Sequence, residues 1–248
     1  MAETEYALFR EPAHSRVTPF GTFVHHPAFP TRYDCNQLVD ARCPRGATAA
    51  FFRNLTAHYA GLNLGFRKIS GHDPVTLERL APVLAREGWQ VNHGRMTVFR
   101  GARVREANPA VTVRAVDPFN PDLETAYIGK RVPGVLDMGF QYHRTQTPRV
   151  GGEWLVAYQD GQPVGTAGWY VVGRLARFRF IGTLEHARSQ GVATTLIRHV
   201  QEHPVVRQQD ALVIFVNDDG PVSLYEDLGF RTVGRMWETT RFLPGFED

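Results

Sequence analysis

A change of hydrophobic period in the second half of this chain constrains its fold most. Three apolar runs come first and are typical of strands: Glu153 to Tyr158, Val164 to Val172 and Leu175 to Leu184. The segments between them, Asp160-Gly161 and Gly173-Arg174, are hairpin turn sequences, so the runs predict an antiparallel meander. From Val192 the apolar residues recur at helical spacing instead, which predicts an amphipathic helix that ends near Pro204.

The segments on either side complete an ordered pattern. They are predicted as a strand at Val111 to Val116, a helix opening at Asp117-Pro118, a buried strand at Ala211 to Val216, a short helix from Pro221 to Leu228, and a last strand from Phe230 to Phe242. The order is strand, helix, three-stranded meander, helix, strand, helix, strand. It predicts an α/β fold of the α+β kind, built on a mixed sheet.

One short motif, Arg188-Ser189-Gln190-Gly191-Val192-Ala193, lies where the meander gives way to the helix. A turn from strand to helix presents free backbone N–H groups at the positive end of the helix, which suits a diphosphate. Gly191 permits close approach of the backbone, Thr194 adds a hydroxyl donor, and Arg188 adds a positive charge. A structural glycine at a helix start is the alternative interpretation.

A second motif, Leu224-Tyr225-Glu226-Asp227-Leu228-Gly229-Phe230, follows the buried strand. A tyrosine in the first turns of a short helix can point its hydroxyl back over the strand end. A phenol, with a pKa near 10, can donate a proton to a departing thiolate. The alternative is a core tyrosine with a single hydrogen bond.

Together the two motifs resemble the GNAT superfamily of N-acetyltransferases. The first is similar to that family's R/Q-x-x-G-x-G/A loop and the second to its L-Y-E-x-L-G-F segment, and the resemblance is specific over Trp154 to Phe242. The strand and helix that begin at Val111 complete the family's domain. The resemblance implies transfer of an acetyl group from acetyl-CoA, without a metal, to a primary amine that attacks the thioester directly.

The resemblance also implies roles for single residues. The diphosphate of acetyl-CoA would lie on the backbone of Arg188, Ser189, Gln190, Gly191, Val192, Ala193 and Thr194. The pantetheine arm would pair with Ile181, Gly182 and Thr183, with Gly182 marking a bulge. Tyr225 would protonate the sulfur. Asn217 or Asp218 would take the place of the family's asparagine, and the usual spacing to the tyrosine selects Asp218. A general base is not evident among the nearby titratable residues, Glu153, Glu185, His186 and His143.

The first half of the chain repeats both motifs in a weaker form. Gly46 to Leu55 matches Gly191 to Val200, and Val83 to Trp89 parallels Leu224 to Phe230. The glycines lie 42 residues apart in the first copy (88 minus 46) and 38 apart in the second (229 minus 191). This predicts two GNAT-like acyl-CoA N-acyltransferase units in tandem, with a boundary in the polar stretch that ends at Asn108-Pro109.

The predicted domains are therefore 1–107 and 108–248. Cys43 stands at the position of Arg188, and Leu84 at that of Tyr225. Without the diphosphate arginine and the phenol, the first domain is expected to be a degenerate half that binds no CoA. Its expected role is to close one side of the acceptor pocket.

Composition and charge limit the classes of binding partner expected for this chain. The charge of +3 and the pI of 9.0 come without a dense basic patch, which argues against nucleic acid. The sequence has no run of about eighteen apolar residues, so no membrane span is predicted. The acidic start of the sequence argues against a signal peptide, and a cytoplasmic location is expected. Cys35 and Cys43 cannot form a disulfide framework, and scattered polar surface is favoured over a metal site with His25, His26 and His58.

The acceptor is expected to be an amine-bearing small molecule or peptide, and the protein a monomer or homodimer. Two other functions stay open. One is transfer of a longer acyl or an aminoacyl group, because similar tandem arrangements occur in mycothiol synthase and in peptide-extending aminoacyltransferases. The other is a non-catalytic acyl-CoA sensor. Tyr225 argues against the sensor, since a binding module has no need of an acid for a thiolate.

Overall fold

The computed structural model describes residues 14–30, 32–101, 105–127 and 138–243. Within this part of the chain two compact units form, residues 96–233 and residues 14–95 with 234–243. Strands β5 (Gln90–Phe99) and β11 (Phe230–Phe242) each have residues in both units. The units thus differ from the predicted domains 1–107 and 108–248, because the end of β5 groups with the second half of the chain and most of β11 groups with the first half. That the domains are two copies of one unit stays a prediction.

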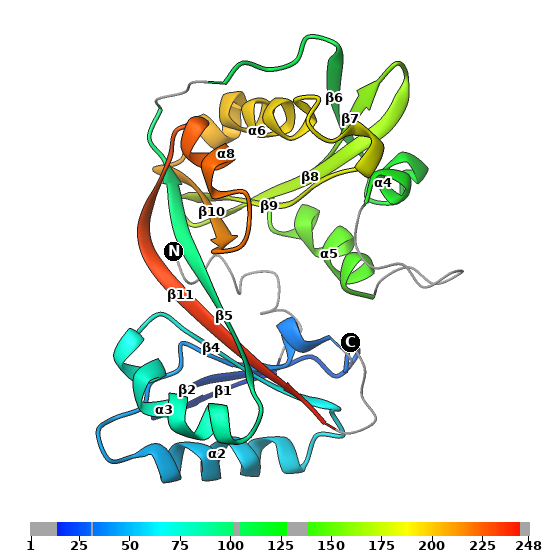
Figure 1. Ribbon diagram of the computed structural model, residues 1–248. Coiled ribbons are helices and arrows are strands. Elements are labelled where there is room, and N and C mark those ends of the chain that lie inside the picture. The colour runs from blue at the N-terminus through cyan, green and yellow to red at the C-terminus, as the bar shows by residue number, and fades with distance from the viewer. Residues whose placement is uncertain (1–13, 31, 102–104, 128–137, 244–248) are drawn as a thin grey trace. The chain divides into compact units, whose positions relative to one another are not determined.

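The unit of residues 96–233 contains a mixed sheet in the order β5-β10-β9-β8-β7-β6 (Figure 1). Its other strands are β6 (Val111–Val116), β7 (Glu153–Gln159), β8 (Gln162–Val172), β9 (Leu175–Thr183) and β10 (Ala211–Asn217). Strands β6 to β9 pair antiparallel, each with the next, whereas β9 and β10 pair parallel. The predicted meander and mixed α/β fold are confirmed.

The helices of this unit are α4 (Pro121–Ala126), α5 (Met138–Arg149), α6 (Val192–Glu202), α7 (Pro204–Arg207) and α8 (Val222–Asp227), with a 3-10 turn, η3 (Glu185–Ala187). They follow the predicted order with two additions, α5 and α7. Helix α6 begins at the residue where the periodicity predicted it. Helix α5 was not predicted, because its sequence is mostly polar and carries a proline, Pro148, near its end.

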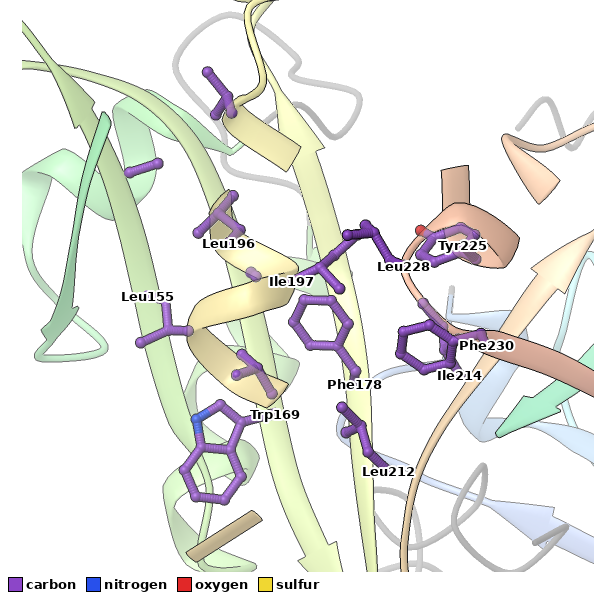
Figure 2. Packing of buried hydrophobic residues seen from close by; sticks show 14 of the residues in the cluster. Leu155, Trp169, Phe178, Leu196, Ile197, Leu212, Ile214, Tyr225, Leu228 and Phe230 are labelled. Atoms are coloured by element: carbon purple, nitrogen blue, oxygen red, sulfur yellow. The ribbon is translucent and has the colours of Figure 1, made fainter. Parts of the chain in front are cut away.

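Strand β7 shows how the helices divide between the two faces of the sheet. Leu155 and Ala157 belong to a buried cluster with Leu196 and Ile197 of α6, which Figure 2 shows at close range. The alternate residues of β7, including Trp154, belong to a second cluster with residues of α4 and α5. Because side chains alternate along a strand, α6 covers one face and α4 and α5 the other. Each large apolar side chain buried this way contributes about 1.5–3 kcal/mol.

Strand β9 carries a bulge beside its pairing with β8. Thr166 pairs with Gly182 and Gly168 with Arg179, so β9 has one residue more than β8 at this point. Phe180 has a φ of 57°, a conformation that costs a bulky residue energy. The bulge had been predicted at Gly182, which instead takes a regular pair. Phe180 is held there by its ring, which stacks on Trp154 with centroids 5.2 Å apart.

The other unit is a smaller sheet in the order β1-β2-β3-β4-β11. Its elements are β1 (His14–Thr18), β2 (Gly21–His25), η2 (Tyr33–Cys35), β3 (Gln37–Val39), α2 (Thr48–Ala60), β4 (Phe66–Gly71) and α3 (Pro74–Arg86). Asp73 caps α3 by accepting hydrogen bonds from the N–H groups of Val75 and Thr76. Trp237 of β11 packs in this unit's core, with its indole N–H donating to the Asp73 carbonyl at 3.0 Å.

Two further properties concern the described residues only. No helix among them is both long and apolar enough to cross a bilayer. Nor do any three of their histidine, cysteine or acidic side chains gather where a metal ion would bind. Cys35 and Cys43 are both buried, and no disulfide joins them.

Candidate active site

Strands β9 and β10 separate and open a wedge in the sheet. Both strands are fully described, and their Cα pairing covers only the stretch in which Leu175 to Arg177 faces Ala211 to Val213. Beyond Arg177, β9 passes through the bulge at Phe180 and ends at Thr183 without pairing to β10. The last residues of β9 therefore keep backbone groups on one edge that no strand of the sheet occupies.

A cavity of about 610 Å³ lies at this wedge, within the range of small-molecule sites. Its described lining comprises Arg105, Ile181, Gly182, Thr183, Ala187, Arg188, Ser189, Gly191, Val192, Ala193, Thr194, Pro221, Ser223, Leu224 and Tyr225. All the residues predicted for the site are among them except Gln190 and Asp218. The structure thus brings together residues from β9, the loop before α6, and α8.

The loop before α6 has the geometry of an anion site. Gly191 caps the helix with a φ of 78°, and Ser189 also has a positive φ, of 62°. The N–H of Thr195 bonds to the carbonyl of Gly191 at 2.9 Å. The N–H groups of Val192, Ala193 and Thr194 come before it and have no acceptor within the helix. With the helix dipole and the exposed Arg188, these donors fit a diphosphate.

The segment before β6 holds this loop in place. The Asn108 side chain donates to the Gln190 carbonyl at 2.8 Å, and its backbone N–H donates to the Thr195 hydroxyl at 2.9 Å. That hydroxyl donates in turn to the Gly191 carbonyl at 2.9 Å. From the sequence, Asn108 was predicted only as part of a domain boundary. An asparagine before a proline is a turn signal and gave no hint of a contact across the fold.

Gln190 supports the loop from outside the cavity. Its side-chain amide donates to the His186 carbonyl at 2.9 Å, and its Oε1 accepts from Gln159 at 3.0 Å. Asp218 lies exposed in the turn after β10 and does not line the cavity. For both residues, a contact with the cofactor stays a prediction.

Tyr225 lies on α8 with only 8% of its surface exposed, and its ring meets Phe230 edge to face at 5.9 Å. Burial raises the pKa of the phenol to about 12, against an opposing effect of the Arg177 charge. The hydroxyl is therefore neutral at pH 7 and can donate a hydrogen bond. Full proton transfer to a thiolate with a pKa of about 8.5 would cost about 5 kcal/mol. The buried phenol suits stabilisation of a developing thiolate better than release of a free proton.

The four titratable residues considered as general base lie outside the described lining of the cavity. Glu185 and His186 are exposed on η3, and Glu153 lies 3.5 Å from His203. His143 is fully buried on α5, with its ring 4.4 Å from that of Phe180 at the bulge. The described lining residues include no carboxylate and no imidazole, so activation of an amine must come from outside this set.

The sequence matches a known family over the part of the chain that forms this site. Residues 151–232 match the model of the family described as acetyltransferase (GNAT) domain. The matched segment contains β7 to β10, the loop before α6, and Tyr225. A comparison with curated proteins finds no match.

Solved structures resemble this chain over nearly its whole length. A GCN5-related N-acetyltransferase from Kribbella flavida is 18% identical with a TM-score of 0.67, over 99% of this chain and 95% of that one. A functionally unknown conserved protein from Staphylococcus epidermidis ATCC 12228 is 16% identical with a TM-score of 0.73, over 93% and 94%. A tandem GNAT protein from the clavulanic acid biosynthesis pathway is 15% identical with a TM-score of 0.56, over 92% and 77%.

At these identities the structures show the fold, which is the mixed α/β fold of GNAT-like proteins, tandem ones included. The family match supports acyl transfer to an amine as the general class of reaction. Residues 151–232 of this chain thus match the GNAT acetyltransferase domain model, and the mixed α/β fold agrees with that match.

Proposed function

We propose that this protein is an N-acetyltransferase that moves the acetyl group of acetyl-CoA to a primary amine. The observation that carries the proposal is the cavity at the wedge, where the open edge of β9, the start of α6 and the Tyr225 phenol meet. An anion site beside a free strand edge suits a long cosubstrate that has a diphosphate in its middle and amide groups along its arm.

Each part of the cavity has a distinct task in this proposal. Arg188 and the N–H groups of Val192 to Thr194 bind the diphosphate. The backbone of Ile181 to Thr183 pairs with the pantetheine arm, and one of its N–H groups steadies the oxyanion. Tyr225 donates a hydrogen bond to the sulfur as negative charge develops there. Acetyl-CoA itself supplies the thioester that the amine attacks.

The first half of the chain is proposed to be a degenerate second GNAT-like unit that binds no CoA. Two pairs of matched glycines share a left-handed backbone: Gly46 and Gly191 with φ of 73° and 78°, Gly88 and Gly229 with 70° and 84°. Cys43, at the position of Arg188, is buried in the core. Its N–H donates to Thr76 Oγ1 at 3.0 Å, and its carbonyl accepts from a side-chain arginine at 2.7 Å. Cys43 itself therefore carries no cation at that position, and the guanidinium beside it, that of Arg79, is bonded to the Cys43 carbonyl.

Calorimetric titration tests the proposal. The purified protein is titrated with acetyl-CoA, with longer acyl-CoAs and with free CoA, and acetylation of a set of amines is followed by mass spectrometry. We expect about one equivalent of acetyl-CoA per chain and preference for the acetyl group. Preference for a longer or an aminoacyl donor would replace the acetyl assignment. Binding without transfer to any amine would favour a sensor, and absence of binding would overturn the proposal.

A further inference from the structure

Arg105 lies outside the residues that match the GNAT family, yet it lines the cavity. Its backbone carbonyl accepts a hydrogen bond from Arg198 of α6 at 3.2 Å. Its side-chain Nε donates to Asp227 of α8 at 2.7 Å. The residue therefore bridges α6 and α8, the two helices that contribute residues to the walls of the cavity. No local pattern in the sequence predicted this position.

The charged side chains among the described lining residues of the cavity are all positive. Its described lining contains two cations, Arg105 and Arg188, and no carboxylate. Asp227, which neutralises Arg105, is not among these lining residues. Both partners of this ion pair are well exposed, with 51% and 37% of their side-chain surfaces accessible. Exposed ion pairs of this kind hold little free energy, so Arg105 can exchange its carboxylate partner for another anion.

We infer that Arg105 is a second phosphate-binding cation of this site, which exchanges Asp227 for a phosphate group of the acyl-CoA. The inference rests on the proposed function. A planar guanidinium binds phosphate oxygens in pairs, and the exposed carboxylate is the weaker competitor once a phosphate with its greater charge is present. Two phosphate groups of the ligand share this chemistry, the 3′-phosphate on the ribose and the diphosphate.

Two variants distinguish a contact of Arg105 with the ligand from a purely structural role of the ion pair. Both variants break the pair between Arg105 and Asp227, but only one removes the cation. Arg105→Met removes the cation, and calorimetry should show a Kd for acetyl-CoA about five- to tenfold higher. Asp227→Asn leaves the cation free, and the Kd should stay unchanged or fall. Arg174→Met is the matched control, because Arg174 is paired with Asp210 at 2.6 Å and does not line the cavity.

A second ligand identifies the phosphate. If Arg105→Met weakens binding of acetyl-CoA but not of acetyl-3′-dephospho-CoA, Arg105 binds the 3′-phosphate. If it weakens both equally while Asp227→Asn weakens neither, Arg105 binds the diphosphate. Equal loss in both variants, or a Kd for Arg105→Met within twofold of the wild type, would overturn the inference and leave the proposed function standing. Failure of the wild-type protein to bind either ligand would overturn both.

Discussion

The side chain of Asn108 donates a hydrogen bond of 2.8 Å to the backbone carbonyl of Gln190, across 82 residues of sequence. The same asparagine blocks space beside the helix cap, because a Cβ added at Gly191 would lie 3.1 Å from Asn108 Cβ. Asn108 thus holds the loop before α6 in one conformation. The N–H groups at the start of α6 therefore keep a fixed orientation. Several experiments can test what depends on this arrangement.

Gly191→Ala should impair binding of acetyl-CoA. The substitution places a Cβ in a left-handed residue, which costs about 1 kcal/mol, and against Asn108, so the loop must move. We expect the Kd measured by calorimetry to rise at least about tenfold. Gly173→Ala is the matched control, because Gly173 has a φ of 58° in a hairpin turn with open space around it. Equal affinity in the two variants would remove the loop from the site.

Tyr225→Phe should lower kcat by about a hundredfold and leave the Kd for acetyl-CoA within about twofold, since the hydroxyl acts on the sulfur during transfer. The phenol pKa of about 12 means that its ionisation should not reduce kcat below about pH 11. Tyr158→Phe is the control. Burial and a hydrogen bond from its hydroxyl to Asp122 also raise the Tyr158 pKa to about 12, but it does not line the cavity. Full turnover by Tyr225→Phe would dismiss the phenol.

Acid should destabilise the unit that contains α2. The ring of His58 stacks on Phe23 at 3.8 Å, and burial, with a smaller effect of Arg16, lowers the pKa of His58 to about 4. Below pH 6.5 the unfolded chain binds a proton that the folded unit accepts only near pH 4, so stability falls across that interval. His58→Phe should reduce this fall by about 1–3 kcal/mol. Hydrogen exchange in α2 at pH 7 and pH 4.5 measures it, and identical pH dependence in both proteins would refute the assignment.

Lys68→Met should destabilise the same unit by about 3 kcal/mol. Lys68 is buried and lies 2.9 Å from Asp34 and 2.8 Å from Glu238. Burial opposes the charge of the amine, but the two carboxylates outweigh it and hold its pKa above the usual range. Removing the amine leaves both carboxylates without this partner. Urea unfolding measures the loss.

A second variant separates charge from packing in that experiment. Adding Glu238→Gln to Lys68→Met should restore part of the lost stability, because one of the two carboxylates is then neutral. If the double variant is no more stable than the single one, the amine contributes through packing of its chain rather than through charge.

Local pattern predicted the strands from β6 onward and the helices α4, α6 and α8, whereas for the first half of the chain it gave only a repeat of the two motifs. Strands β6 and β11 have the bounds that were predicted for them. Helix α5 was not predicted because its residues are mostly polar. The bulge was placed at a glycine since glycine is the common choice, whereas stacking of Phe180 on Trp154 favours a strained phenylalanine.

The contacts that support the site were not predicted from the sequence, for a different reason. Asn108 meets Gln190 across 82 residues, and Arg105 meets Asp227 across 122. Such pairs depend on tertiary folding and leave no periodic trace in the sequence. The motif residues themselves were recognisable because a strand-to-helix turn with a glycine has a local cause.

Strand β11 gives Phe230 to one hydrophobic core and Trp237 to the other. Strand β5 likewise has residues in the unit of residues 96–233, where the Thr97 hydroxyl donates to the Ile214 carbonyl at 3.1 Å. A fragment produced by cleavage after residue 107 would lose the β5 segment that Thr97 belongs to and would carry Trp237 away from the core that buries it. Both pieces would then present bare strand edges and apolar rings, and neither would be expected to stay in solution by itself.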